Sequence, residues 1–146
     1  MSTNDPRAAW AAMQQSVIED VRQNGRPTSG PFAGRDLLIL TTTGARTGAA
    51  RSSALAFTRA GDDYVVIASK GGSPQHPGWY HNLVANPIVT VETGGERFQA
   101  QAIALASGEE RDRLYAAQAE RYPTFRDYER KTDRTIPVVR LRRLPA

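Results

Sequence analysis

The sequence predicts an α+β fold, in which an antiparallel sheet or small barrel of about six strands is flanked by four helices. Strand-like segments follow one another with connections of hairpin length, and four segments carry a helical pattern. No G-x-G-x-x-G fingerprint follows a strand, which argues against a parallel dinucleotide-binding unit. The 146 residues suit one domain, residues 1–146, large enough to bury a core.

The first predicted helix covers residues 6–23. Asp5 and Pro6 fit an N-cap and a first helical position, and Asn24 with Gly25 fits a stop. We expect its apolar stripe to pack on the domain, with contact to a membrane surface as the alternative. The helix and the following loop form an N-terminal segment, residues 1–30, beside a body at 35–142. The stripe consists of Trp10, Met13, Val17 and Val21.

The middle of the chain predicts five strands and one short helix. Runs of apolar and β-branched residues bounded by turn signals indicate strands, and Gly94 with Gly95 indicates a hairpin turn. A short helix at 78–85 ends at Asn86 and Pro87. The expected strands are 37–43, 51–58, 64–69, 88–93 and 97–105.

The C-terminal part predicts two helices and a last strand. Ser107 followed by Glu110 is a capping-box pattern and predicts a helix at 108–120. A short helix at 124–131 follows Pro123, and the final strand is expected at 137–142.

Composition excludes several classes of function. The chain has no cysteine, which rules out disulfides, thiolate catalysis and cysteine-bound metal. Its net charge is +4, but the basic residues form no block, so an anionic small molecule fits as well as a polynucleotide. The first residues lack a secretory pattern, and no apolar run has the length of a membrane span. We therefore expect a cytoplasmic protein.

The first candidate site is the hairpin TTTGARTGAAR at 41–51. Glycines let backbone N–H groups converge on an anion, and Thr hydroxyls and Arg side chains add donors. The ending of a Walker A loop is missing, and a strand follows instead of a helix. The pattern leaves two interpretations open, an ordinary hairpin turn or an anion site.

The second candidate is SKGGSPQHPGWYHN at 69–82, which leaves a buried strand and enters the short helix. Such a turn is a common ligand site, although a surface loop with Trp79 packed in the core is equally well supported. His76 and His81 do not indicate a metal site, because Pro77 lies between them and no nearby carboxylate completes a ligand set.

The third candidate is the aromatic group Tyr122, Phe125 and Tyr128. Their spacing places the three rings near one helical face, which is typical of core packing. A neutral phenol beside a pocket could also orient or protonate a carbonyl, nitro or quinone oxygen.

These three stretches, in this order, resemble the deazaflavin-dependent nitroreductase family. The motifs are TTTGARTGAAR, DDYVVIASKGGSPQHPGWYHNLVANP and RYPTFRDYERKTDRTIPVVRL, and the likeness runs from Arg35 to Leu141. The resemblance implies an antiparallel split β-barrel and an oxidoreductase that uses reduced coenzyme F420. The implied acceptors are quinones, nitroaromatics and activated enones or lactones, and the cofactor would supply the redox chemistry.

The resemblance also implies roles for individual residues. The hairpin would hold the phosphate and glutamyl tail, the next two strands would line the deazaflavin, and the short helix would close over it, with Trp79 and Tyr80 as walls. Ser69, Tyr122 and Tyr128 would position the acceptor, with Ser69 as a hydrogen-bond donor. The implied cofactor residues are Ala45, Arg46, Thr47, Arg51, Ser52, Ser53, Ala54, Leu55, Ala56, Ile67, Ala68, Ser69, Lys70, Gly78, Trp79, Tyr80, His81, Asn82 and Phe125.

Two departures from the family pattern affect these expectations. Relatives that reduce bicyclic nitroimidazoles carry Tyr where this chain has Phe125, which puts that activity in doubt. Ala45 and Arg46 stand where a basic pair is frequent, so the tail contact would be weaker.

Two other functions compete with F420-dependent reduction: FMN-dependent oxidation–reduction on the same barrel, and non-enzymatic binding of an anion or lipid. The sequence leaves open a lipid quinone as acceptor, peripheral contact with the inner face of a membrane, and a monomer or a homodimer. We expect no nucleic acid and no metal.

Overall fold

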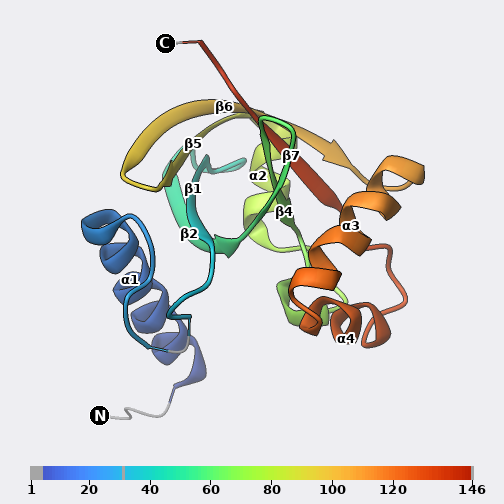
Figure 1. The fold of residues 1–146 in the computed structure, drawn as a ribbon, viewed down its shortest axis with the longest axis horizontal. Helices are drawn as coiled ribbons and strands as arrows, with labels where there is room; N and C mark the ends of the chain where they lie inside the picture. Colours follow the sequence, from blue (N-terminus) through green and yellow to red (C-terminus); the bar gives the residue numbers. More distant parts are fainter. Residues whose placement is uncertain (1–4, 31, 146) are drawn as a thin grey trace.

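The computed structural model describes residues 5–30 and 32–145, which form a curled antiparallel sheet with helices around it (Figure 1). The α+β prediction is confirmed, and the sheet has the form of a half-barrel. In hydrogen-bonding order its strands are β2-β1-β5-β6-β7-β4-β3, and every pair is antiparallel. The strands are β1 (Leu37–Thr43), β2 (Ala50–Ala56), β3 (Thr58–Ala60), β4 (Asp63–Ile67), β5 (Ile88–Thr93), β6 (Glu96–Leu105) and β7 (Val138–Arg143).

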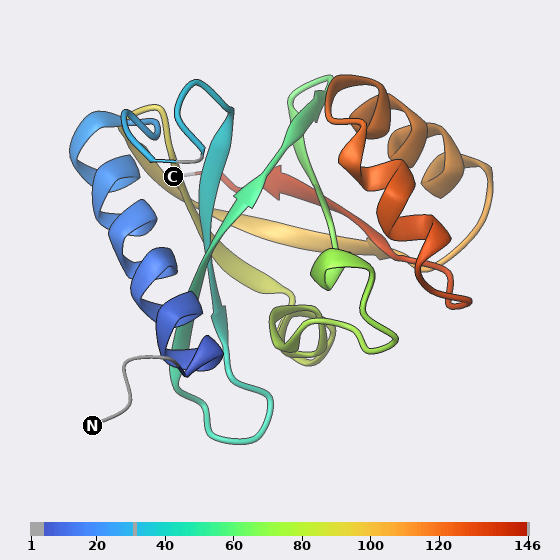
Figure 2. The same ribbon diagram turned by 90° about the horizontal axis from the view of Figure 1, so that it is seen from below.

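Helix α1 and the α3–α4 pair lie on opposite sides of the sheet (Figure 2), and α2 packs Trp79 and Leu83 against the interior of the barrel. None of the helices in the described part of the chain combines the length and the apolarity that a bilayer crossing requires. The helices are α1 (Pro6–Asn24), the short 3-10 turn η1 (Lys70–Gly72), α2 (Gly78–Ala85), α3 (Glu109–Arg121) and α4 (Thr124–Arg130).

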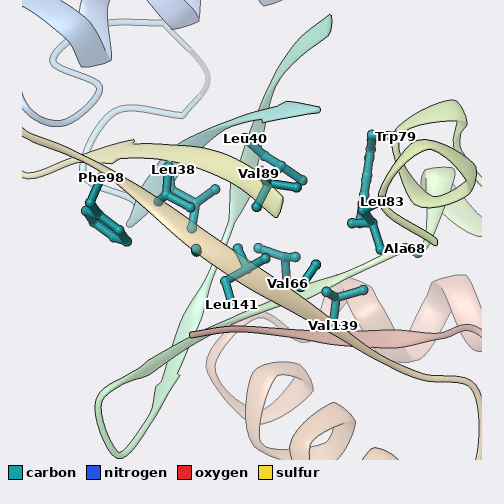
Figure 3. Close-up of a cluster of buried hydrophobic side chains, with 13 residues drawn as sticks. Leu38, Leu40, Val66, Ala68, Trp79, Leu83, Val89, Phe98, Val139 and Leu141 are labelled. Atoms are coloured by element: carbon teal, nitrogen blue, oxygen red, sulfur yellow. The ribbon is translucent and has the colours of Figure 1, made fainter. Parts of the chain in front are cut away.

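Strand parity divides the core into an interior and two outer layers. In β1, Leu38 and Leu40 point into the barrel, whereas Leu37 and Ile39 face α1, so four consecutive residues are buried. Val66 of β4 likewise faces the interior, while its neighbours in β4 face α3 and α4. Figure 3 shows the interior cluster, with the side chains of β1, β4, β6 and β7 meeting.

The predicted strand at 51–58 is wrong in one respect, because the structure splits it at Phe57. Ala56 pairs with Leu37 at one edge of the sheet, and Thr58 pairs with Val65 at the opposite edge. The chain crosses at this point from one edge of the curled sheet to the other. Seven strands therefore replace the expected six, for a reason that lies in barrel closure and not in local propensity.

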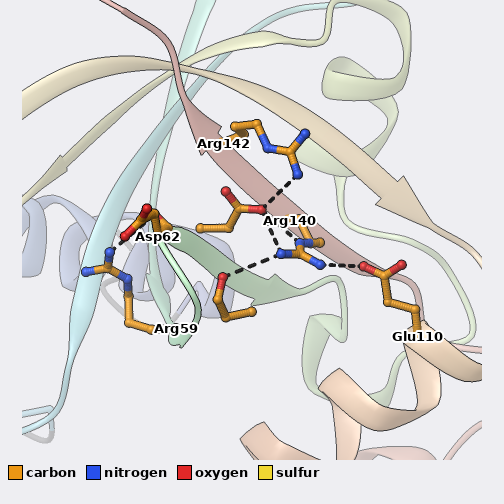
Figure 4. A network of polar contacts seen from close by, with 7 residues as sticks. Arg59, Asp62, Glu110, Arg140 and Arg142 are labelled. Carbon is orange, nitrogen blue, oxygen red and sulfur yellow. Dashed lines mark hydrogen bonds and ion pairs between the residues drawn. The ribbon is translucent and has the colours of Figure 1, made fainter.

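The predicted capping box is also wrong. The N-cap of α3 is Gly108, which has a φ of 108° and makes no side-chain cap, so Ser107 and Glu110 do not bond reciprocally. Glu110 instead accepts a hydrogen bond from Arg140 of β7, and Arg140 also bonds to the buried Asp63 at 2.9 Å (Figure 4). This network on the outer face of the sheet anchors α3, although the helix itself lies where predicted.

The remaining predicted elements are confirmed to within about two residues. The short helix has its expected bounds, and α1 ends at Asn24, where Gly25 takes a φ of 79° and donates to the carbonyl of Val21 at 2.7 Å. Gly94 and Gly95 both have positive φ, as the two-residue turn between β5 and β6 requires.

Candidate active site

Two adjoining cavities open on one side of the barrel. The larger, about 1080 Å³, lies between α1, β2, η1, α2 and α4, and the smaller, about 510 Å³, lies between the β1–β2 turn and α2. Arg51, Gly78 and Asn82 line both cavities. We therefore treat the two as one elongated site with a narrow end and a wide end.

The narrow end carries groups that attract an anion. Arg46 and Arg51 are exposed on the β1–β2 hairpin, and none of the described residues that line this end is Asp or Glu. The hydroxyl of Thr47 accepts a hydrogen bond from the N–H of Ala49, and the side chain of Asn82 accepts one from the N–H of Ala45 at 3.0 Å. Fixed dipoles and two guanidinium groups thus surround a space without negative charge, which suits a phosphate or carboxylate.

Strand β2 forms one wall of the wide end. It is an edge strand, so one side of its backbone is not paired with another strand. Gln14 of α1 accepts a hydrogen bond from the N–H of Ala54 at 3.0 Å, and the hydroxyls of Ser52 and Thr41 lie 2.7 Å apart. Mostly small side chains leave room for a planar ring against the wall: Ser52, Ser53, Ala54, Leu55 and Ala56.

The turn after β4 faces this wall across the cavity. Ile67 and Ser69 line the site at the end of the strand, followed by Lys70 and Gly71. Lys70 has a φ of 45°, which a side-chain-bearing residue rarely adopts. The turn therefore presents its hydroxyl, ammonium and backbone groups in an unusual conformation that other contacts must hold.

Aromatic side chains of the α3–α4 corner close the wide end. The hydroxyl oxygen of Tyr122 accepts from the N–H of Asp36 at 3.2 Å and from Nε of Arg121 at 3.1 Å. Because both acceptor positions are filled, the phenolic proton is left for another acceptor. Phe125 packs edge-on against Tyr128, with ring centroids 5.3 Å apart. The corner combines a phenolic hydroxyl with an apolar surface.

The structure brings most of the residues singled out in the sequence to the two cavities, but not all. The side chain of Ala68 is buried in the barrel interior, and Tyr80 lines neither cavity. Trp79 is 9% exposed and packs in the same interior cluster, so the expectation of core packing is met, although one edge of it still lines the wide end. Successive residues of a helix are rotated by about 100°, so Asn82 also reaches the wide end, whereas Tyr80 does not. His81 reaches only the narrow end.

Several residues of the wide end were not predicted as site residues. Trp10 is 60% exposed at the start of α1, and Gln14, Arg22 and Arg35 also line the cavity. The apolar stripe of α1 could have indicated Trp10 as a site residue, because Trp10 extends the stripe beyond the part that packs on the sheet. Thr124 lines the wide end as well, and its Oγ1 is buried without a hydrogen-bond partner among the described residues.

The two histidines do not form a metal site with other residues. Their rings lie 5.7 Å apart, and Nδ1 of His76 is hydrogen-bonded to Arg134 at 2.8 Å. Over residues 5–30 and 32–145, no three His, Cys, Asp or Glu side chains gather as metal ligands would.

Comparison with known families decides what kind of site this is. Residues 13–143 match the family model of the F420H(2)-dependent quinone reductases. The chain belongs to this family. It is accordingly a reductase whose cofactor is coenzyme F420, and the resemblance of its three motifs is confirmed at the level of family, fold and cofactor.

Individual relatives agree with the family. An F420H(2)-dependent quinone reductase of Mycobacterium tuberculosis H37Rv is 43% identical over 108 residues, which are 73% of this chain and 72% of that protein. The solved F420-H2 dependent reductase FDR-A is 41% identical, with a TM-score of 0.67 over 73% of this chain and 94% of the other. A solved domain-swapped dimer is 34% identical, with a TM-score of 0.69 over 92% and 98% of the two chains.

The residues of the site fit the coenzyme of the F420H(2)-dependent reductases. Among the described residues that line either cavity there are five cationic side chains and no carboxylate. Arg22 is paired with Glu92 outside the cavities, and the other four suit a phosphate with an acidic tail. The mostly small side chains of β2 leave space for a ring system at the wide end. The cationic residues are Arg22, Arg35, Arg46, Arg51 and Lys70.

Proposed function

We propose that this chain holds coenzyme F420 along both cavities and reduces a quinone-type acceptor at the wide end. The single observation that carries the proposal is the sharing of Arg51 and Asn82 between the two cavities. An elongated molecule with an anionic tail and a planar ring can thereby lie across both at once. When bound in its reduced form, the coenzyme supplies the hydride.

The narrow end binds the anionic tail through Ala45, Arg46, Thr47 and Arg51. Two-point guanidinium contacts are well suited to phosphate and carboxylate oxygens. Asn82 holds the turn that presents these groups, through its bond to the backbone of Ala45. The assigned residues that line the wide end, along β2, at the end of β4 and at the start of α2, surround the ring.

The wide end positions the acceptor between the ring and the α3–α4 corner. Tyr122 donates its free phenolic proton to an acceptor oxygen, and Ser69 donates from the opposite side. Phe125 is 9% exposed and offers carbon where a tyrosine would offer a hydroxyl, which favours a quinone ring over a nitroimidazole. Proton delivery after reduction comes from water or one of these hydroxyls, without a covalent intermediate on the protein.

The outer part of the wide end favours an apolar acceptor, and we propose a lipid quinone. Trp10, Ile18 and Phe32 line this part, and Trp10 is largely exposed. Aromatic side chains of this kind insert at a membrane surface, which would bring α1 to the lipid that dissolves the quinone. Sedimentation with vesicles that contain menaquinone tests the contact, and retention of the protein in the supernatant would contradict it.

We also propose that the reductase is a homodimer, because a related chain 34% identical to it forms a domain-swapped dimer. Light scattering after size-exclusion chromatography should give twice 16.0 kDa. A particle of 16.0 kDa would contradict the proposal.

Titration with oxidised F420, run beside FMN, tests the site assignment. We expect selective binding of F420, and we expect Arg51→Gln to weaken it by about tenfold or more through loss of a charge-assisted contact. Arg126→Gln is the matched control, because Arg126 is exposed on α4 and lines neither cavity. Preference for FMN would move the chain to the flavin-binding alternative, and unchanged F420 binding by Arg51→Gln would refute the tail assignment.

A further inference from the structure

The turn that carries Ser69 into the wide end is conformationally strained. Lys70, Gly71 and Gly72 have φ values of 45°, 63° and 84°, three successive residues in the left-handed region. Lys70 is the one non-glycine residue with positive φ in the described part of the chain. A residue held this way costs about 1–3 kcal/mol and persists only where surrounding contacts determine it.

One side chain bonds to the backbone on both sides of these three residues. Arg134, in the loop between α4 and β7, donates from Nη2 to the carbonyl of Ser69 at 2.8 Å and to that of Ala68 at 3.2 Å. Its Nε donates to the carbonyl of Ser73 at 2.8 Å. The guanidinium therefore bonds to the backbone at both ends of the turn, at Ser69 before Lys70 and at Ser73 after Gly72. Arg134 lines neither cavity, so it acts on the site through the turn.

The fourth contact of this guanidinium depends on a proton. Nη1 of Arg134 lies 2.8 Å from Nδ1 of His76. Arginine has donors only, so His76 must accept, which requires a neutral imidazole with its hydrogen on Nε2. A protonated His76 would place two N–H groups and two positive charges against each other.

The surroundings of His76 favour the neutral form. The charged and titratable groups that contact it are Arg134 from the loop before β7, and Tyr80 and His81 from α2, with ring centroids 4.9 and 5.7 Å away. None of them is a carboxylate. Burial, followed by the charges of Arg134 and His81, lowers the pKa of His76 from its ordinary 6.5.

We infer that Arg134 is a positioning residue for the coenzyme site, and that proton uptake by His76 loosens its hold on the turn that carries Ser69 and Lys70. The inference rests on the proposed function for the place of the coenzyme. Below the titration midpoint of His76, the turn loses one anchor and coenzyme affinity falls. A lysine cannot replace Arg134, because one ammonium group cannot reach both ends of the turn and the imidazole together.

Nuclear magnetic resonance on the coenzyme-free protein tests the turn directly. We expect the imidazole signals of wild-type His76 to show hydrogen on Nε2, and the amide signals of residues 70–72 to shift with its titration midpoint. In His76→Asn, the amide oxygen still accepts from Arg134 but does not titrate, so this shift should vanish. In Arg134→Lys, the same amides should shift at neutral pH, whereas they should not in the surface control Arg126→Lys.

Binding of oxidised F420, measured at each pH for wild type and His76→Asn, tests the consequence. Comparison at one pH cancels any titration of the coenzyme itself. Below the midpoint we expect wild type to bind about fivefold more weakly than His76→Asn, with equal binding at neutral pH. Arg134→Lys should weaken binding at all pH values, and a melting curve establishes that it is folded.

The outcomes separate the inference from the proposed function. If residues 70–72 do not respond to His76 or to Arg134→Lys, the inference fails even though F420 binds. Equal pH dependence in wild type and His76→Asn would also overturn it. If F420 does not bind at all, the proposed function fails, while the coupling between His76 and the turn is still measured.

Discussion

Asn82 of α2 accepts a hydrogen bond from the backbone N–H of Ala45 at 3.0 Å, so the helix and the β1–β2 hairpin are joined at the narrow end of the site. The same amide donates to the hydroxyl of Thr42 at 3.2 Å. One side chain therefore fixes the β1–β2 turn, the proposed anion site, relative to the helix that lines both cavities. This arrangement makes the shape of the tail site depend on a residue that need not touch the tail.

Asn82→Ala should weaken coenzyme binding and lower stability together. Removal of the amide takes its donor from the buried hydroxyl of Thr42, at a cost of about 1–3 kcal/mol, and frees the N–H of Ala45, an exposed residue, from the helix. We expect KM for reduced F420 to rise with little change in kcat. Asn86→Ala is the matched control at the C-cap of the same helix, since the side chain of Asn86 makes one long bond of 3.4 Å to the carbonyl of Thr43 and lines neither cavity. Equal effects in the two variants would contradict this role.

The sequence predicted those parts of the fold that local signals determine. The hairpin at Gly94 and Gly95, the stop of α1 at Gly25 and the bounds of α2 all follow from residues within a few positions. The break of the second strand at Phe57 was not predictable in this way. It depends on the pairing of Ala56 and of Thr58 with strands at opposite edges of the sheet.

The site shows the same division. Motif resemblance pointed to the hairpin, the turn after β4 and the aromatic corner, and the structure brings them around one pair of cavities. The motif resemblance could not show that Ala68 and Tyr80 lie outside the cavities while their neighbours line them, because strand parity and helix rotation decide which side chains reach a cavity. Gln14 was missed since its partner, the N–H of Ala54, is 40 positions away.

Gly72→Ala should destabilise the protein more than Gly71→Ala. A Cβ at residue 72 would lie 2.9 Å from the carbonyl oxygen of Tyr128 and 2.9 Å from Cβ of Lys131, whereas one at residue 71 would meet nothing within 4 Å. Both positions have positive φ, so the shared conformational cost of about 1–3 kcal/mol cancels in the comparison. Urea denaturation of the two variants measures the difference. Equal free energies of unfolding would contradict the prediction, because they would mean that α4 moves away from the added Cβ without a loss of stability.

Asp20 should contribute stability that disappears in acid. Hydrogen bonds from Thr28, first from its hydroxyl and then from its N–H, and from Asn24 lower the pKa of Asp20 from 3.8 to about 2. Because the folded pKa is below the unfolded value, the contribution is complete above pH 3.8 and is lost as pH falls toward 2. Melting temperatures of wild type and Asp20→Asn should therefore converge across that window.

Thr28→Ala gives an independent check on the acid effect, because it removes the largest cause of the lowered pKa while the carboxyl group stays. The pH dependence of this variant should begin to resemble that of Asp20→Asn. A difference between wild type and Asp20→Asn that stays constant from pH 5 to pH 2 would rule out the linkage.

Trp10 and Val21, on the same face of α1, should have separable roles. Val21 is 2% exposed and packs with Leu37 and Ile39 of β1, so Val21→Ala should lower the free energy of unfolding by about 2 kcal/mol. Trp10 is 60% exposed and lines only the wide end, so Trp10→Ala should leave the melting temperature nearly unchanged. The apolar acceptor loses contact area in Trp10→Ala, and its KM should rise while KM for the coenzyme stays constant. If Trp10→Ala lowers the melting temperature as much as Val21→Ala does, Trp10 belongs to the packed contact between α1 and the sheet. If KM for the acceptor is unchanged in Trp10→Ala, α1 is not part of the acceptor site.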